Sequence, residues 1–122
     1  MAKVLVIEDE EQVRDMIRQT LERAGHEVFE AGDGEEGLAV FDNRKIDLVV
    51  TDILMPKKGG LVTILELRQK NPDLKIIAMS GGGRSGKLNF LSTAKTFPGV
   101  KTFRKPFRKT EFLAAVDELL AE

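Results

Sequence analysis

Short apolar runs that recur along the chain constrain its fold more than any other feature. Most are apolar throughout rather than alternating with polar residues, which is typical of parallel strands covered on both faces. A segment with helical spacing or a helical start signal follows each run, so we predict an α/β fold with helices on both sides of a sheet. The predicted strands are Lys3–Ile7, Glu27–Glu30, Asp47–Thr51, Leu74–Met79 and Val100–Arg104.

The predicted helices begin and end at residues that favour helix termini. Residues 11–24 carry apolar side chains at helical spacing, and Gly25 is suited to end this helix. Asp33, with Glu36 three positions on, has the form of an N-cap for a helix that runs to about Asp42. Further helices are predicted at Leu61–Lys70, more weakly at Ser85–Lys95, and at the C-terminal end, where Phe112, Leu113, Val116, Leu119 and Leu120 share one face.

Right-handed crossovers between five parallel strands favour a doubly wound, flavodoxin-like sheet in the order 2-1-3-4-5. Ligands of such sheets bind beyond the carboxyl ends of the strands, beside the switch point between strands 1 and 3. Polar side chains are predicted to follow four of the strands at this edge, so a functional site is expected there. These residues are Glu8 and Asp9, Asp52, Ser80 and Lys105.

Composition narrows the chemistry that is available to this site. The 122 residues include no cysteine and a single histidine, His26, which excludes thiolate sites and disfavours a Ser-His-Asp triad or a histidine-rich zinc site. We expect His26 to be a connector residue on the surface. No apolar run approaches the roughly 20 residues of a membrane span, and no signal peptide is recognisable. We therefore expect one cytoplasmic domain over residues 1–122, without membrane association.

The carboxylates at this edge predict a metal site. Three negative charges close together repel one another unless a cation neutralises them. Mg²⁺, or Mn²⁺ in its place, fits because hard divalent cations prefer oxygen ligands and keep several waters. We predict Asp9 and Asp52 as direct ligands and Glu8 as a ligand through water. The acidic stretch EDEEQ also argues against a nucleotide phosphate on this loop, since such sites use glycine amides at a helix start.

With a cation bound, Asp52 can act as a nucleophile toward phosphorus and form an aspartyl phosphate. The transfer needs mainly positioning and neutralisation of charge, which the metal and Lys105 would supply. The Ser80 hydroxyl is expected to donate a hydrogen bond to a phosphoryl oxygen, with glycines 81–83 leaving the backbone free to approach. Pro56 and Gly59–Gly60 are interpreted as a turn that starts the next helix.

Five motifs in this order, VLVIEDE, DLVVTDILMP, the GG that follows it, IIAMSGG and FRKPF, resemble the receiver domain of two-component response regulators, of the single-domain chemotaxis-regulator kind. The resemblance covers essentially the whole chain. It implies that Asp52 accepts a phosphoryl group from a sensor histidine kinase or phosphotransfer protein and that the domain switches conformation in a phosphorelay, without acting as an enzyme on outside substrates. It also implies that the backbone carbonyl of Leu54 binds the metal and that the Lys105–Pro106 bond is cis.

One position departs from the family pattern. Receivers commonly carry a tyrosine or phenylalanine three residues before the lysine as part of the switch, and this chain has Thr102 there. Phe103 has the opposite strand parity and is expected to face the core unless the register of this strand slips. We hypothesise that Ser80 together with order and mobility of residues 81–96 carries the switch instead. Leu54 and Gly82 flank the site and are expected to affect phosphate lifetime in opposite directions.

Charge is distributed unevenly. Residues 74–110 hold nine Lys or Arg and no acid, whereas residues 1–73 hold ten Lys or Arg and 16 acids. The basic segment is either a solvated surface that offsets the acidic remainder or a docking face for an acidic partner. It spans the face that receivers use for downstream partners, formed by helix 4, strand 5 and helix 5. Direct nucleic-acid binding is not expected, because no DNA-binding motif is present.

Two other functions are compatible with parts of this pattern. A constitutive interaction module with a receiver fold would not need the phosphorylation residues, which are all present. A haloacid-dehalogenase-type phosphohydrolase also uses an aspartate nucleophile but carries a second aspartate two residues later, where this chain has Leu54. The signalling switch is therefore the preferred interpretation.

Overall fold

The computed structural model describes residues 2–53, 60–80, 98–105 and 107–121 of the chain. Its five strands pair in parallel in the order β2-β1-β3-β4-β5, as predicted. The strands are β1 (Lys3–Ile7), β2 (Glu27–Ala31), β3 (Leu48–Asp52), β4 (Lys75–Ser80) and β5 (Val100–Arg104). β3 and β4 each end one residue later than predicted. Asp52 and Ser80 are therefore the last residues of their strands and not the residues that follow them.

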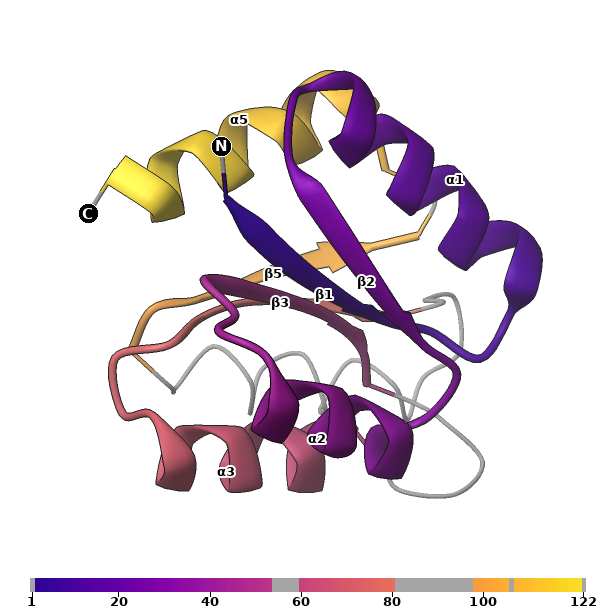
Figure 1. The fold of residues 1–122 in the computed structure, drawn as a ribbon. Helices are drawn as coiled ribbons and strands as arrows, with labels where there is room; N and C mark the ends of the chain where they lie inside the picture. Colours follow the sequence, from indigo (N-terminus) through magenta and orange to yellow (C-terminus); the bar gives the residue numbers. More distant parts are fainter. Residues whose placement is uncertain (1, 54–59, 81–97, 106, 122) are drawn as a thin grey trace.

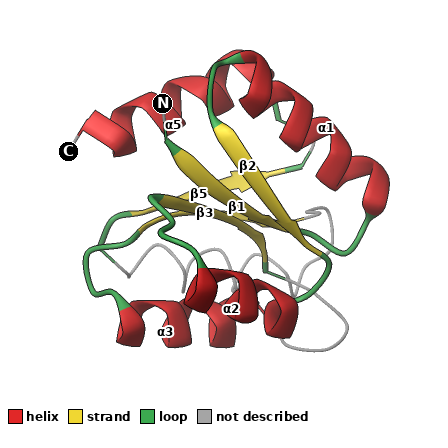
Figure 2. Ribbon diagram, viewed as in Figure 1, coloured by secondary structure: helices red, strands yellow, loops and turns green. Residues whose placement is uncertain are grey.

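Helices cover both faces of this sheet (Figure 1). α1 and α5 lie on one face, and α2 and α3 lie on the other (Figure 2). The bounds are α1 (Glu11–Arg23), α2 (Gly34–Asn43), α3 (Gly60–Lys70) and α5 (Lys109–Ala121). The helix predicted at Ser85–Lys95 and glycines 81–83 lie outside the described residues. In the part of the chain that the structure describes, no helix has the length and apolar character needed to cross a membrane.

Alternate residues of the strands pack into two separate cores. Val4 and Val6 of β1 contribute to the core beneath α1 and α5, whereas Leu5 and Ile7 contribute to the core on the α2 and α3 side. All four side chains are fully buried, and each contributes about 1.5–3 kcal/mol through the hydrophobic effect. A rigid sheet packed on both faces thus holds the polar residues at its carboxyl edge.

Two helix ends have the structures that the sequence predicts. Gly25 has φ of +94°, and its N–H donates to the Glu22 carbonyl while the His26 N–H donates to the Leu21 carbonyl, which is a Schellman motif. Asp33 caps α2, since its Oδ1 accepts a 2.8 Å hydrogen bond from the Glu36 N–H.

The side-chain parity of β5 confirms the prediction for Phe103. This residue is in register with Met79 of β4 and packs against Phe107 and Phe112, with ring centroids 5.6 and 6.3 Å away. Thr102 is in register with Ala78, whose side chain belongs to the opposite core. The register of β5 has therefore not slipped to place an aromatic residue at position 102.

Candidate functional site

Three carboxylates meet at the carboxyl edge of the sheet, at the switch point between β1 and β3. Glu8 and Asp9 directly follow β1, and Asp52 ends β3. One oxygen from each of the three lies within 4.8 Å of the others. Glu8 is fully buried and Asp52 is 5% exposed, whereas Asp9 is exposed. The fold thus brings together the three acidic residues that the sequence analysis selected.

Lys105 follows β5 and extends its side chain into this cluster. Its Nζ lies 2.7 Å from Oε1 of Glu8 and 3.3 Å from Oδ2 of Asp52. Its backbone N–H donates a 2.7 Å hydrogen bond to the carbonyl of Ser80, which is buried at the end of β4. The end of β4 therefore holds the backbone from which the lysine reaches the acids.

The cluster carries more negative than positive charge, because two buried carboxylates share one ammonium group. Burial raises the pKa of Glu8 to about 7; the hydrogen bond from Lys105 opposes this rise, and the charge of Asp52 adds to it. Burial lowers the pKa of Lys105, but the hydrogen bond to Glu8 and the charges of Asp52 and Glu8 leave it above its usual value. An additional cation would be stabilised here.

The donor set matches a hard divalent cation. Carboxylate oxygens close to one another are the ligands that Mg²⁺ and Mn²⁺ prefer, and one or two of them commonly suffice. Glu8, Asp9 and Asp52 can provide these oxygens. The predicted fourth contributor, the Leu54 carbonyl, lies outside the described residues, as do Gly82 and Pro106.

Glu8 is held by contacts that the sequence analysis did not identify. Its N–H donates to the carbonyl of Ala31 at 3.0 Å, and its carbonyl accepts a 2.8 Å hydrogen bond from Nη1 of Arg14. Its Oε2 accepts a 3.1 Å hydrogen bond from the N–H of Glu10. The direct contact with Lys105 was also missed. An arginine one turn into the helix that follows an acidic pair is the sequence signal for the Arg14 contact.

Gly60 packs directly against the backbone of the site and does more than shape a turn. A Cβ at this position would lie 2.4 Å from the carbonyl oxygen of Asp52 and 2.4 Å from the Cα of Ile53. The Gly60 N–H also donates a hydrogen bond to the Ile53 carbonyl at 2.6 Å. Glycine thus allows α3 to begin directly against the backbone that carries Asp52.

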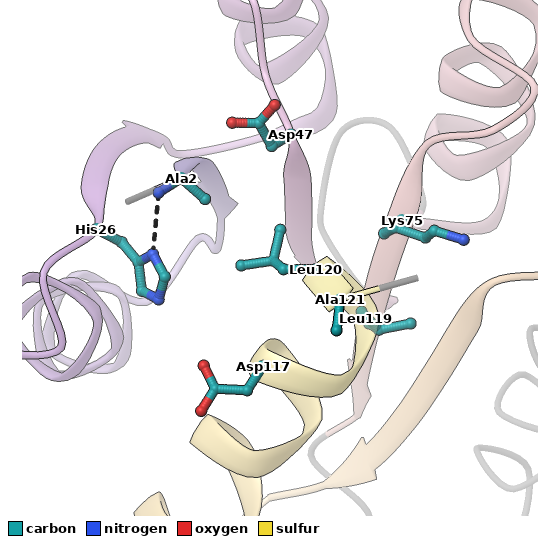
Figure 3. Close-up of a pocket in the computed structure, with 8 residues that line it drawn as sticks. All are labelled: Ala2, His26, Asp47, Lys75, Asp117, Leu119, Leu120 and Ala121. Carbon is teal, nitrogen blue, oxygen red and sulfur yellow. Dashed lines mark hydrogen bonds between the residues drawn. The ribbon is translucent and has the colours of Figure 1, made fainter.

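A separate cavity of about 570 Å³ lies at the opposite end of the sheet, beside the residues that precede or begin the strands (Figure 3). His26 lines it and is half-buried there. Its Nδ1 accepts a 3.2 Å hydrogen bond from the N–H of Ala2, so it links the beginning of β1 to the α1–β2 connection. None of the acidic cluster lines this cavity.

The sequence that forms this edge of the sheet matches a known protein family. The sequence model of the response regulator receiver domain matches residues 4–117. The chain belongs to this family. It is thus a receiver domain of two-component response regulators, and the match includes Glu8, Asp9, Asp52, Ser80 and Lys105.

Curated relatives of this receiver domain are longer proteins. It is 30% identical over 120 residues to the transcriptional regulatory protein CpxR of Klebsiella pneumoniae, and the match covers 98% of this chain and 50% of CpxR. It is 33% identical over 124 residues to the sensor kinase CckA of Brucella abortus, with 98% of this chain and 12% of CckA covered. The chain therefore spans half or less of the length of these two relatives.

Two solved structures match this chain over nearly their full length. A response regulator receiver domain protein from Clostridium thermocellum has a TM-score of 0.91 and 31% identity, covering 99% of this chain and 95% of that one. The response regulator TrrA from Thermotoga maritima, solved in complex with Mg²⁺ and BeF, has a TM-score of 0.86 and 31% identity, covering 98% and 99%. The receiver architecture of this chain is thereby established.

Proposed function

We propose that Asp52 accepts a phosphoryl group from the phosphohistidine of a sensor histidine kinase or phosphotransfer protein. A carboxylate oxygen of Asp52 forms a bond to phosphorus while the bond from phosphorus to the histidine nitrogen breaks, and the imidazole leaves. The observation that carries this proposal is the position of Asp52, almost fully buried at the end of β3 with its Oδ2 3.3 Å from the Lys105 ammonium. Lys105 would neutralise charge on the transferred group.

The contacts of the other two acids support the choice of Asp52. Glu8 uses Oε1 to bind Lys105 and Oε2 to bind the Glu10 N–H, and burial raises its pKa to about 7, so it is a poor nucleophile. Asp9 is exposed and better placed to bind an ion from solvent. The buried Ser80 at the neighbouring strand end would donate a hydrogen bond from its hydroxyl to a phosphoryl oxygen.

The reaction is proposed to require Mg²⁺ or Mn²⁺. Asp9 and Asp52 would bind the ion directly, Glu8 through water, and Leu54 through its backbone carbonyl. When bound, the ion would supply positive charge to the phosphoryl oxygens. The carboxylate cluster supports this assignment, as does the complex of the related TrrA with Mg²⁺ and BeF.

Signalling is proposed to run through the face that includes β5 and α5. Arg104, Arg108 and Lys109 are exposed there and would attract an acidic downstream partner, whereas Lys101 pairs with Glu118 at 2.7 Å. The switch itself would involve Ser80 and residues 81–96, with Thr102 in place of an aromatic residue. The domain would work in the cytoplasm and catalyse only its own phosphorylation and dephosphorylation.

Labelling by acetyl phosphate tests the central assignment. Mg²⁺-dependent labelling of the wild type is expected, with complete loss in Asp52→Asn. Asp47→Asn is the matched control because Asp47 precedes the other end of the same strand, where its Oδ2 accepts a hydrogen bond from the Lys3 N–H; labelling should continue. Persistent labelling of Asp52→Asn would assign the phosphate to another residue. A wild type that is never labelled would indicate the constitutive interaction module.

A further inference from the structure

We propose that Arg14 is a positioning residue for the metal site, acting through the peptide that joins Glu8 to Asp9. This inference rests on the proposed metal binding by the acidic cluster. Arg14 lies in the first turns of α1, with its side chain 20% exposed, and it contacts none of the three carboxylates in the described hydrogen bonds and ion pairs. Its guanidinium instead donates from Nη1 to the carbonyl of Glu8 at 2.8 Å.

The contact controls the direction of Asp9 because a peptide unit is planar. The carbonyl of Glu8 and the N–H of Asp9 belong to the same rigid unit. A hydrogen bond that fixes this carbonyl therefore fixes the plane from which the Asp9 Cα and side chain project. The N–H of Glu8 is already held by the Ala31 carbonyl, so Arg14 completes the restraint on both sides of Glu8.

The start of α1 adds one restraint on this loop, since the Glu10 N–H donates a 3.1 Å hydrogen bond to Oε2 of Glu8; the plane of the Glu8–Asp9 peptide is left to Arg14. The N-cap residue of the helix, Glu10, makes no side-chain capping hydrogen bond. The Arg14 backbone N–H donates to the Glu10 carbonyl at 2.9 Å, so the same residue closes the first helical turn and reaches back to the loop before it. The guanidinium is itself anchored, since its Nε lies 3.5 Å from Oε1 of Glu30 on β2.

Positioning and simple electrostatics predict opposite effects of removing Arg14. A positive charge near a cation site repels the incoming ion, so loss of the charge alone would tighten Mg²⁺ binding. Loss of a residue that orients a metal ligand would weaken binding, commonly by about 10-fold to 100-fold. The sign of the change therefore separates the two roles.

Arg18 offers a matched control on the same helix. It lies one turn after Arg14, and its Nε is 3.7 Å from the other oxygen of Glu30. Its remaining ion pairs are with Asp15 and Glu22, and none of its described contacts involves Glu8. Arg18→Met thus removes a comparable charge and a Glu30 contact without disturbing the Glu8–Asp9 peptide.

The test is a Mg²⁺ titration of the full chain in which the amide chemical shifts report ion binding. Arg14→Met is expected to weaken Mg²⁺ binding about tenfold, Arg14→Lys to weaken it less, and Arg18→Met to leave it unchanged. In the metal-free proteins the amide nitrogen signal of Asp9 should shift in Arg14→Met but not in Arg18→Met. The same spectra show whether each variant is folded. If Arg14→Met is unfolded, Arg14→Lys serves as the test variant in its place.

Each contrary result has a defined meaning. Equal or tighter Mg²⁺ binding by Arg14→Met, or equal weakening by Arg18→Met, would overturn the role of Arg14 and leave the proposed metal site intact. If Arg14→Met is unfolded, equal binding by wild type and Arg14→Lys with no shift at Asp9 would overturn it as well. A wild type that binds no Mg²⁺ at the cluster would overturn both.

Discussion

The ammonium nitrogen of Lys105 lies 2.7 Å from a carboxylate oxygen of Glu8, so the lysine of this receiver domain is bound to the first acid of the site as well as facing Asp52 at 3.3 Å. Both carboxylates are buried, and one positive charge cannot fully offset two negative ones. We therefore expect stability, and the proposed metal binding and phosphorylation, to depend on the same three charged groups.

Stability of the metal-free protein should decrease as the pH rises through the titration of Glu8. The pKa of Glu8 is raised from 4.5 to about 7 in the folded state, so the fold binds a proton more tightly than the unfolded chain does. Stabilisation by the proton is complete below about pH 4.5 and is lost as the pH approaches 7. The loss is at most about 3 kcal/mol.

Urea unfolding of wild type and Glu8→Gln between about pH 4.5 and pH 8 measures this effect. As the pH rises, the unfolding free energy of Glu8→Gln should increase relative to that of the wild type, because glutamine does not ionise. Glu11→Gln is a control, since Glu11 is exposed on the first turn of α1, and its curve should run parallel to that of the wild type. Parallel curves for Glu8→Gln as well would contradict the prediction.

Replacing Lys105 by methionine should destabilise the fold by about 3–5 kcal/mol, because buried carboxylates lose their counter-charge. Lys101→Met is the comparison: Lys101 pairs with Glu118 where the two side chains are 33% and 63% exposed, and such pairs contribute about 1 kcal/mol or less. Denaturant unfolding with and without Mg²⁺ should show that the ion raises the unfolding free energy of Lys105→Met by more than that of the wild type, and that of Lys101→Met by the same amount as the wild type. Equal losses in the two variants would contradict the central role of Lys105.

The strands, their order and the composition of the site could be predicted because they depend on local patterns and on a general property of parallel sheets. Apolar runs identify the strands, and the carboxyl ends of parallel strands meet at one edge. The ends of β3 and β4 were predicted one residue early. Asp52 and Ser80 continue the backbone pairing with Met79 and Arg104, which a polar side chain does not prevent.

Details that depend on three-dimensional distances could not be predicted in the same way. Glu8 and Lys105 are 97 positions apart, and which oxygen faces the ammonium depends on the conformations of two loops. The need for glycine at position 60 arises from the closeness of α3 to the Asp52 backbone, which no periodicity reveals. The orientation of Phe103 was predictable, because strand parity alone decides which face a side chain occupies.

Removing the Phe112 ring should destabilise the core without changing the chemistry of the site. This side chain is fully buried and stacks on Phe107 with ring centroids 5.1 Å apart. Phe112→Ala should lower the free energy of unfolding by about 3–5 kcal/mol. Phe107→Ala should lower it less, because Phe107 is only partly buried. Thermal unfolding measures both losses. Labelling by acetyl phosphate well below the transition should remain near wild-type level, and its loss in the folded variant would argue against this separation.

Replacing Gly60 by alanine should affect stability and phosphorylation together. The added Cβ would lie 2.4 Å from the Asp52 carbonyl oxygen and from the Ile53 Cα, so the backbone must move, at an expected cost of about 3 kcal/mol. Gly25→Ala is the comparison: Gly25 has φ of +94° but open space around the new Cβ, and the expected cost is about 1–2 kcal/mol. Denaturant unfolding and acetyl phosphate labelling of folded protein should separate the two variants. Labelling should slow in Gly60→Ala because Asp52 is displaced from Lys105, and it should be unchanged in Gly25→Ala; normal labelling of Gly60→Ala would show that α3 can shift without moving the acceptor.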